Sequence, residues 1–400
     1  MNMIFAPRLN RIKHSPSNAA TQKVRELRAQ GRDIIGLTIG EPDFPTPDNV
    51  KRAVVEAMAR NDTRYTTVDG TDEMKDAVRL KFKRENGLVY ARDQITVANG
   101  AKQIVFNAMM ATLSQGDEVV IPAPYWVSYC DMALVADGTP KAVECREDKG
   151  FKLTAEQLEA AITPRTKWLV LNSPGNPTGA AYSRSELAAL ADVLLRHPQV
   201  WILTDDIYEH LLFEDREFAT IAQVEPELYA RTLTVNGVSK AYSMTGWRIG
   251  YAGGPKELIR NMAKLQSQST SNPCSISQAA AIEALTGPQE YVHLRALEFE
   301  QRRNVVVPML NAAPGLTCRM PEGAFYAFPN CSGVLGKKTP DGKKLVTEQD
   351  FALYLLDSGV AGIQGEAYGL SPYMRFSIAT DLASLKEACG RIQRACAALT

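Results

Sequence analysis

Apolar and polar positions between residues 94 and 204 follow two alternating rhythms. Short runs rich in Val, Ile and Leu predict buried strands, and between them apolar residues recur at helical spacing. Strands that alternate with helices form mostly parallel sheets, because each crossover helix returns the chain to the same end of the sheet. The pattern predicts strands at 94–98, 118–122, 168–171 and 200–204, and helices at 101–113, 126–135 and 185–196.

The pattern changes after residue 240, where long helices are predicted at 255–268, 275–285 and 291–310. From residue 315, short strands at 325–328 and 374–378 mix with helices at 348–356 and 382–397, which is typical of a smaller α+β unit. A helical pattern over residues 12–31 is assigned to the same unit. A chain of 400 residues is long enough for two cores. We predict a large domain at 46–295 and a small domain formed by 1–45 and 296–400.

Charge and cysteine content argue against several classes of partner. The 45 acidic and 45 basic residues cancel, with a pI near 6.9, so nothing favours nucleic acid or an anionic membrane over small metabolites. The seven cysteines include no CxxC pair, which argues against a disulfide framework or a zinc site. Residues 1–13 lack the apolar core of a signal peptide, and no run could span a membrane. A cytoplasmic protein is therefore expected.

Lys240 is the first candidate for chemistry. Most lysines are solvated surface charges. This one lies among apolar residues, and desolvation there disfavours the ammonium form and leaves a larger fraction of nucleophilic amine. Such an amine can hold an aldehyde as a Schiff base. The apolar neighbours are Val235, Val238, Met244, Trp247, Ile249 and Tyr251.

A candidate anion site lies at the segment Asn99-Gly100-Ala101-Lys102-Gln103, between a predicted strand and a predicted helix. Glycine lets the backbone approach a phosphate, and the first free N–H groups of the helix point at it with the positive end of the dipole. Glycine at such a turn also serves backbone geometry alone, so this signal is weak by itself. Ser239 and Arg248, on either side of Lys240, could complete the site with a hydroxyl and a guanidinium.

Acidic residues follow the predicted strand 200–204, where open α/β sheets bind their ligands. Asp205 could pair with a pyridine nitrogen and keep it protonated, so that the ring accepts electrons from a developing carbanion. Capping of a helix is the alternative reading for Asp205 and for Asp206. Tyr208, three residues after Asp205, could face the same way and bind a ring hydroxyl.

Two further strand ends carry candidate ligands. The turn Asn172-Ser173-Pro174-Gly175-Asn176-Pro177-Thr178-Gly179 has a composition that a rigid turn explains, except for the amide of Asn176, which could contact both a ring hydroxyl and a substrate carboxylate. Trp126, after the strand 118–122, offers a flat face to a planar ring, although packing in the core is the ordinary role of tryptophan.

Taken together, these segments resemble the pyridoxal-phosphate-dependent aminotransferases of class I, fold type I, in the bacterial aspartate aminotransferase subgroup. The resemblance spans nearly the whole chain. The resemblance implies an α/β fold with a mostly parallel seven-stranded sheet between helices and a smaller α+β domain. The matching segments are Gly40-Glu41-Pro42-Asp43-Phe44, Tyr65, 99–103, 124–129, 176–179, 205–208, 239–250, Gly323-Ala324-Phe325-Tyr326 and Arg375-Phe376-Ser377.

The resemblance implies roles position by position. Lys240, Asp205 and Tyr208 would be catalytic, with Lys240 holding pyridoxal phosphate and moving the substrate's α-proton. Trp126 would stack on the cofactor ring and Asn176 would bind its hydroxyl. The phosphate would be surrounded by Gly100, Ala101, Lys102, Ser239 and Arg248, and by Tyr65 from the other subunit of a homodimer. Arg375 would hold the substrate carboxylate, and the other substrate contacts would be Gly40, Trp126, Asn176 and Lys102. No metal is implied.

The implied reaction is ping-pong transfer of an amino group between an L-amino acid and a 2-oxo acid. Lys102, with hydroxyls near Ser15 and Ser17, favours aspartate and glutamate. Some relatives use prephenate, and Lys167 matches a lysine found in that set, so prephenate or aromatic substrates are an alternative. A lyase on the same fold, and a cofactor-binding protein without catalysis, are further alternatives. A nicotinamide dehydrogenase is disfavoured because no GxGxxG motif joins a strand to a helix.

Overall fold

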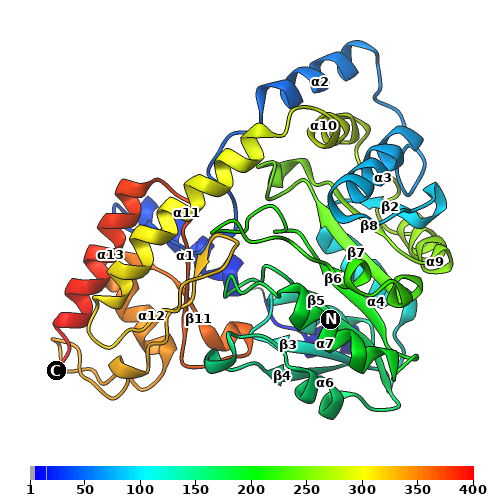
Figure 1. The fold of residues 1–400 in the computed structure, drawn as a ribbon. Coiled ribbons are helices and arrows are strands. Elements are labelled where there is room, and N and C mark those ends of the chain that lie inside the picture. The colour runs from blue at the N-terminus through cyan, green and yellow to red at the C-terminus, as the bar shows by residue number, and fades with distance from the viewer. Residues whose placement is uncertain (1–4, 15) are drawn as a thin grey trace.

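The computed structural model describes residues 5–14 and 16–400. Figure 1 shows a sheet flanked by helices and, beside it, a smaller group of helices and short strands. The long helix α11 (Glu290–Asn311) runs from one group to the other.

A seven-stranded sheet in the order β2-β8-β7-β6-β5-β3-β4 forms the centre of the larger group. All neighbours pair in parallel except β8, which is antiparallel to both β7 and β2. The expected α/β fold with a mostly parallel seven-stranded sheet is confirmed. The strands are β2 (Ile95–Ala98), β3 (Glu118–Ala123), β4 (Thr139–Glu144), β5 (Thr166–Asn172), β6 (Trp201–Asp205), β7 (Thr232–Gly237) and β8 (Gly250–Gly253).

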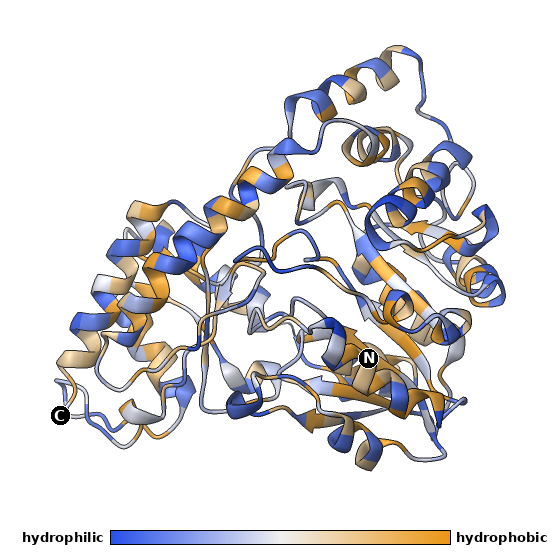
Figure 2. Ribbon diagram, viewed as in Figure 1, coloured by the Kyte–Doolittle hydropathy of each residue, from blue (hydrophilic) through white to orange (hydrophobic). Residues whose placement is uncertain are grey.

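Helices cover both faces of this sheet because side chains alternate along each strand. Val119 and Ile121 pack in a cluster with α4, α5 and α9, whereas Val120 between them packs with α6 and α7 on the other face. Figure 2 shows the resulting hydrophobic colouring along the strands. The helices of this group are α2 (Asp48–Ala59), α3 (Asp72–Asn86), α4 (Ala101–Thr112), α5 (Ser128–Val135), α6 (Ala155–Ala161), α7 (Arg184–Leu195), α8 (Ile221–Val224), α9 (Lys256–Ser267) and α10 (Ser275–Thr286).

The smaller group draws on both ends of the chain. β1 (Ile35–Gly36) pairs in parallel with β10 (Val360–Ala361), and a second small sheet has the antiparallel order β11-β12-β9. The predicted boundaries at 45/46 and 295/296 stay a prediction, and α11 continues through residue 295 without a break. The remaining elements are α1 (Pro16–Ala29), β9 (Tyr326–Ala327), α12 (Glu348–Asp357), β11 (Ile363–Gln364), β12 (Met374–Ser377) and α13 (Leu382–Ala397).

The structure corrects the predicted helix at 12–31. Residues 12–14 are not helical, a short 3₁₀ helix occupies Pro7–Arg11, and α1 begins at Pro16. Proline lacks a backbone N–H and is therefore accommodated in the first turn of a helix but not in its interior. Strands β4, β7 and β8 were not predicted. Of these, β4 is a half-exposed edge with Pro140 and Lys141, and β8 contains two glycines, so neither has the usual composition of a strand.

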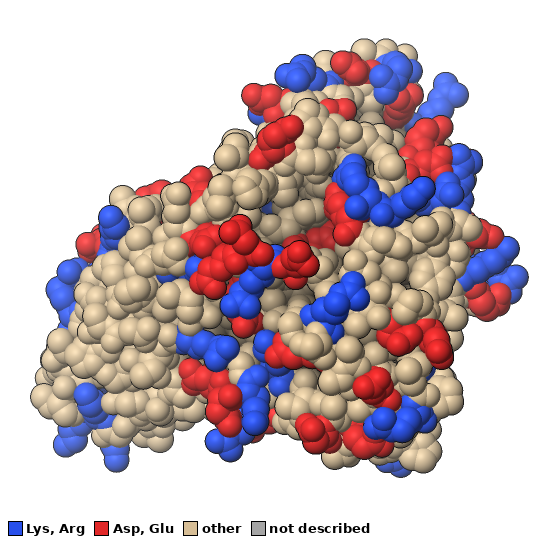
Figure 3. All heavy atoms as spheres, in the orientation of Figure 1, with Lys and Arg blue, Asp and Glu red and all other residues tan. Residues whose placement is uncertain are grey.

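Charges of both signs are mixed over the face drawn in Figure 3, in keeping with the balanced composition. All seven cysteines are free thiols, as expected. Among the described residues, no helix combines the length and the apolar character needed to cross a membrane.

Candidate active site

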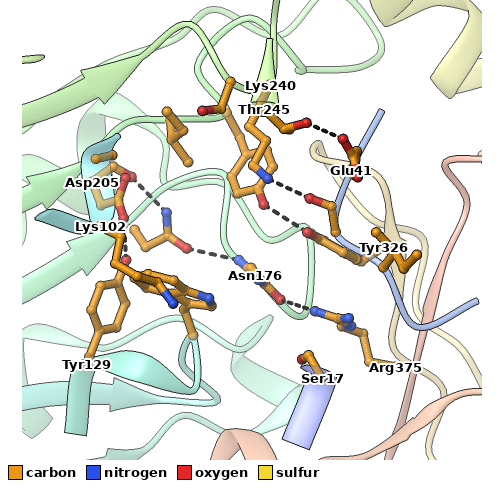
Figure 4. Close-up of a pocket in the computed structure, with 18 of the residues that line it drawn as sticks. Ser17, Glu41, Lys102, Tyr129, Asn176, Asp205, Lys240, Thr245, Tyr326 and Arg375 are labelled. Carbon is orange, nitrogen blue, oxygen red and sulfur yellow. Dashed lines mark hydrogen bonds between the residues drawn. The ribbon is translucent and has the colours of Figure 1, made fainter. Parts of the chain in front are cut away.

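A cavity of about 310 Å³ opens at the carboxyl ends of the parallel strands, between the large sheet and the smaller group. Parallel strands deliver their following loops to this edge, which explains why residues far apart in sequence meet here. Figure 4 shows their side chains around a common space. Eleven of the predicted site residues line the cavity: Gly40, Ala101, Lys102, Trp126, Asn176, Asp205, Tyr208, Ser239, Lys240, Arg248 and Arg375.

Lys240 points into this cavity from the loop after β7. Its Nζ donates to the backbone oxygen of Gly40 at 2.5 Å. Burial lowers the pKa of Lys240 to about 8. The carboxylate of Glu41 opposes this shift, whereas the positive charges of Arg248 and Arg375 reinforce it. The amine therefore loses its proton far more easily than a surface lysine, as a nucleophile or a general base requires.

Asp205 ends β6 and is 5% exposed. The hydroxyl of Tyr129 donates to Asp205 Oδ2 at 2.6 Å, whereas Oδ1 is buried without a hydrogen-bond partner in the part of the chain described. Burial raises the pKa of Asp205, and the hydrogen bond from Tyr129 acts in the opposite direction. A buried carboxylate oxygen without a partner is costly. Asp205 Oδ1 is therefore an unused acceptor at the cavity wall, where a protonated ring nitrogen could bind.

Arg375, on β12, is almost fully buried and reaches the cavity from the side opposite β6. Its Nη1 donates to Asn176 Oδ1 at 3.1 Å and its Nη2 donates to the backbone oxygen of Thr38 at 2.6 Å. The guanidinium lies between the rings of Tyr326 and Tyr368, with its carbon 4.7 and 5.1 Å from their centroids. These contacts fix the planar fork that a carboxylate binds through two parallel hydrogen bonds.

The start of α4 provides the anion site that the sequence predicts. Gly100 is the N-cap with φ of 89°, and the helix begins at Ala101 in the cavity wall. The positive φ of Gly100 explains the glycine, because other residues rarely adopt this conformation, and a Cβ there would also meet the guanidinium of Arg248. Arg248 is held by a hydrogen bond from Nη1 to the backbone oxygen of Thr245 at 2.7 Å. Free N–H groups and a guanidinium therefore converge on one corner of the cavity.

Lys102 and Trp126 lie against each other in the wall of the cavity. Lys102 Nζ lies 4.8 Å from the centroid of the Trp126 ring and 3.3 Å from Ser128 Oγ. Burial lowers the pKa of Lys102, and the charge of Arg248 adds to this effect. Trp126 thus lines the cavity as expected, and Ser17 lines it as well, on the side of Arg375 (Figure 4).

Four predicted residues lie elsewhere or are not described. Tyr65 is 93% exposed and outside the cavity of this single chain, and Gly100 precedes the lining residue Ala101 without lining the cavity itself. Lys167 is at the amino end of β5, away from the cavity, and its Nζ pairs with Asp117 Oδ2 at 3.0 Å. Its match to a lysine of the prephenate-using relatives therefore stays a sequence observation, without a contact to the cavity in this chain. Ser15 lies outside the described residues.

The structure adds residues to which the sequence assigned no role. The Tyr326 hydroxyl is 2.8 Å from that of Tyr208, and Thr245 donates a hydrogen bond to Glu41. Tyr129 and Asn172 also line the cavity. Most of these residues lie inside segments that carried the family resemblance, but their partners are distant in the sequence. In the sequence, only their position within a motif could have indicated that these residues belong to the site.

Comparison with known proteins identifies the family. The model of the family "Aminotransferase class I and II" matches residues 32–392. The chain belongs to this family of aminotransferases. A relative from Cereibacter sphaeroides (strain ATCC 17029 / ATH 2.4.9), named aspartate/prephenate aminotransferase, is 61% identical over 98% of each chain. The aspartate aminotransferase of Rhizobium meliloti (strain 1021) is 57% identical over 98% of this chain and 96% of its own.

Solved structures agree with this family. A crystal structure of the aspartate aminotransferase from Rhizobium meliloti has a TM-score of 0.97 and 56% identity, with both chains fully covered. The Thermus thermophilus aspartate aminotransferase with maleate has a TM-score of 0.91 and 41% identity over 98% of this chain and all of its own. The fold type I fold is thereby confirmed.

The aminotransferase depends on pyridoxal phosphate, as its family does, and its cavity fits this cofactor chemically. The cofactor carries an aldehyde, a phosphate and a basic ring nitrogen. The cavity offers Lys240 with a lowered pKa, the N-terminus of α4 with Arg248, and the unpaired Oδ1 of Asp205. Each group of the cofactor therefore has a complementary group in the wall.

Proposed function

We propose that this aminotransferase transfers the amino group of aspartate or glutamate to a 2-oxo acid by a ping-pong mechanism. The supporting observation is the cavity that holds Lys240, Asp205 and Arg375 together, with Lys102 at its outer end. An amine, a buried acid and two further cations suit a substrate with an amino group and two carboxylates. Bound pyridoxal phosphate supplies the electron sink that stabilises the carbanion formed at the substrate α-carbon.

Each residue of the cavity has a separate role in this proposal. With pyridoxal phosphate bound, Lys240 Nζ would hold its aldehyde group, and the same amine would take the proton from the substrate's α-carbon. Its lowered pKa supports this role. Asp205 Oδ1 would keep the ring nitrogen protonated, and Tyr208 and Asn176 would donate hydrogen bonds to the ring oxygen. Trp126 would cover one face of the ring. Gly100, Ala101, Lys102, Ser239 and Arg248 would hold the phosphate.

Substrate orientation depends on Arg375. Its guanidinium would bind the α-carboxylate beside Gly40 and Asn176 and present the α-hydrogen to Lys240 Nζ. Lys102 and Ser17, which both line the cavity, would bind the distal carboxylate. The aspartate aminotransferase names of the relatives, and the maleate named with the Thermus thermophilus structure, support a dicarboxylic substrate. Prephenate is a second candidate because the Cereibacter sphaeroides relative is named for both activities.

We further propose a cytoplasmic homodimer whose two sites are shared between subunits. Tyr65 is 93% exposed, and Val55 and Met58 on the neighbouring helix α2 are 61% and 49% exposed. Apolar and aromatic side chains gathered in this way suit an interface. Tyr65 of one subunit would bind the phosphate in the other.

The visible absorption spectrum of the purified protein with pyridoxal phosphate tests this function. Addition of aspartate or glutamate without any acceptor should bleach the cofactor band and release one equivalent of 2-oxo acid per site. A 2-oxo acid should then restore the band. D-aspartate serves as the control, since the fixed geometry of Arg375 and Lys240 presents only one α-hydrogen. Continuous release of ammonia with the oxo acid would instead establish a lyase and overturn the proposal.

A further inference from the structure

The side chain of Asn172 joins two loops of the cavity through both ends of its amide. Its Nδ2 donates to the backbone oxygen of Asp205 at 2.7 Å, and its Oδ1 accepts from the backbone N–H of Asn176 at 2.9 Å. Asn172 is the last residue of β5 and stands opposite Asp205 in the register of β5 with β6. It also lines the cavity. The amide thus continues the connection between two strands at the point where the backbone ladder ends.

The two residues that Asn172 joins are otherwise held from different directions. The carboxylate of Asp205 is fixed by Tyr129, which leaves Oδ1 free, and the side-chain oxygen of Asn176 is fixed by Arg375. In Figure 4 the hydrogen bonds run from Asp205 to Asn176 and on to Arg375. The side chain of Asn172 therefore connects the backbones of Asp205 and Asn176 directly. This connection sets the position of one residue relative to the other.

We propose that Asn172 is a positioning residue that sets Asp205 and Asn176 at the spacing of two atoms on one rigid ring, the nitrogen and the hydroxyl oxygen of the pyridoxal ring. This inference rests on the proposed function. A ring cannot adjust its own dimensions, so an error in the separation of its two partners weakens at least one of the two hydrogen bonds.

The chemistry of the amide explains why asparagine stands here. Aspartate would keep the acceptor for the Asn176 N–H but lose the donor to the Asp205 oxygen. Leucine has a similar shape and would lose both bonds. Each bond lost leaves a backbone group of a buried loop without its partner, and the loops would move to satisfy it. Two graded variants, Asn172→Asp and Asn172→Leu, therefore separate the donor from the whole bridge.

Asn311 offers a matched control. At the end of α11 its Nδ2 donates to the backbone oxygen of Cys318 at 3.0 Å and its Oδ1 accepts from the Cys318 N–H at 2.6 Å. This bridge uses the same amide groups as Asn172 but is not part of the cavity wall. Asn311→Leu should lower thermal stability and leave cofactor binding unchanged.

The test measures the affinity of the cofactor-free proteins for pyridoxal phosphate and the pH midpoint of the visible band after loading. Hydrogen bonds donated to the ring oxygen withdraw negative charge from that oxygen. The oxygen then stabilises the proton at Lys240 Nζ less strongly. Their loss should therefore raise the midpoint, by about half a pH unit in Asn172→Leu. Affinity should fall about tenfold in Asn172→Leu, which is about 1.4 kcal/mol, and less in Asn172→Asp.

The outcomes separate the two proposals. Wild-type affinity and midpoint in a folded Asn172→Leu or Asn172→Asp protein would overturn the positioning role. A loss of stability equal to that of Asn311→Leu, with no change in midpoint, would reduce Asn172 to a structural bridge and overturn it as well. If the wild type itself takes up no pyridoxal phosphate, the proposed function fails first, and the positioning role falls with it.

Discussion

At the scale of single residues, the cavity is built from charged groups with altered proton affinity. Lys240 and Lys102 have lowered pKa values, and Asp205 has a raised one, with burial as the largest cause in each case. Burial makes each charged form less favourable, so the site gains free energy when these charges meet partners of opposite charge. The anionic phosphate and the protonated ring nitrogen of the cofactor supply such partners. Binding of the cofactor therefore also neutralises the unfavourable buried charges of the empty cavity.

The pKa of Lys240 predicts how capture of pyridoxal phosphate depends on pH. With a pKa of about 8, Nζ is mostly ammonium at lower pH and mostly free amine at higher pH. Only the free amine attacks the aldehyde, so the capture rate should rise about tenfold between about pH 7 and about pH 9 and then level off. Stopped-flow absorbance of the cofactor-free protein measures this rate. The variant Lys240→Ala should show no absorbance change from captured pyridoxal phosphate. In the wild type, a capture rate that rises steadily to about pH 10.5 would contradict burial of the amine.

At the scale of elements, the phosphate site depends on close contact between a strand and a helix. β8 runs antiparallel beside β7, and its Gly250 abuts the first residues of α4. A Cβ at this position would overlap the backbone of Gly100 and Ala101. The absence of a side chain lets the N-terminus of α4 reach the cavity with its N–H groups free.

Gly250→Ala should therefore displace the start of α4 and weaken phosphate binding. We expect at least a tenfold loss in affinity for pyridoxal phosphate and a smaller change for pyridoxal, which lacks the phosphate. Titration of the cofactor-free variant measures both affinities. Gly246→Ala is the control, because a Cβ there meets nothing within 4 Å. Equal losses for the two ligands would show a general collapse of the cavity instead of a defect at the helix end.

At the scale of the whole molecule, the cavity is shared between the large sheet and the smaller group. Tyr208 contacts Tyr326, Asn176 contacts Arg375, and Lys240 contacts Gly40, each pair joining the two groups. Relative movement of the groups would change all three contacts together. The proposed binding and catalytic residues therefore come from separate parts of the fold.

The proposed homodimer with shared sites predicts complementation between two inactive variants. Tyr65→Ala should impair the site of the neighbouring subunit, and Lys240→Ala should disable its own. After unfolding and refolding together in equal amounts, about half of the dimers are mixed. Each mixed dimer has one intact site, so activity should return to roughly a quarter of the wild type. Sedimentation should confirm the dimer, and failure to regain activity would place Tyr65 outside the neighbouring site.

The sequence by itself determined the alternation of strands and helices, because side-chain periodicity is a local property of the chain. It also indicated Lys240 and Asp205 from their local surroundings, and Arg375 through the family resemblance. Only the tertiary structure decided the antiparallel direction of β8 and the bonds of Asn172, Tyr129 and Tyr326. Asn176 and Arg375, for example, are 199 positions apart. Their contact arises from sheet order and packing between groups, which no local pattern of residues encodes.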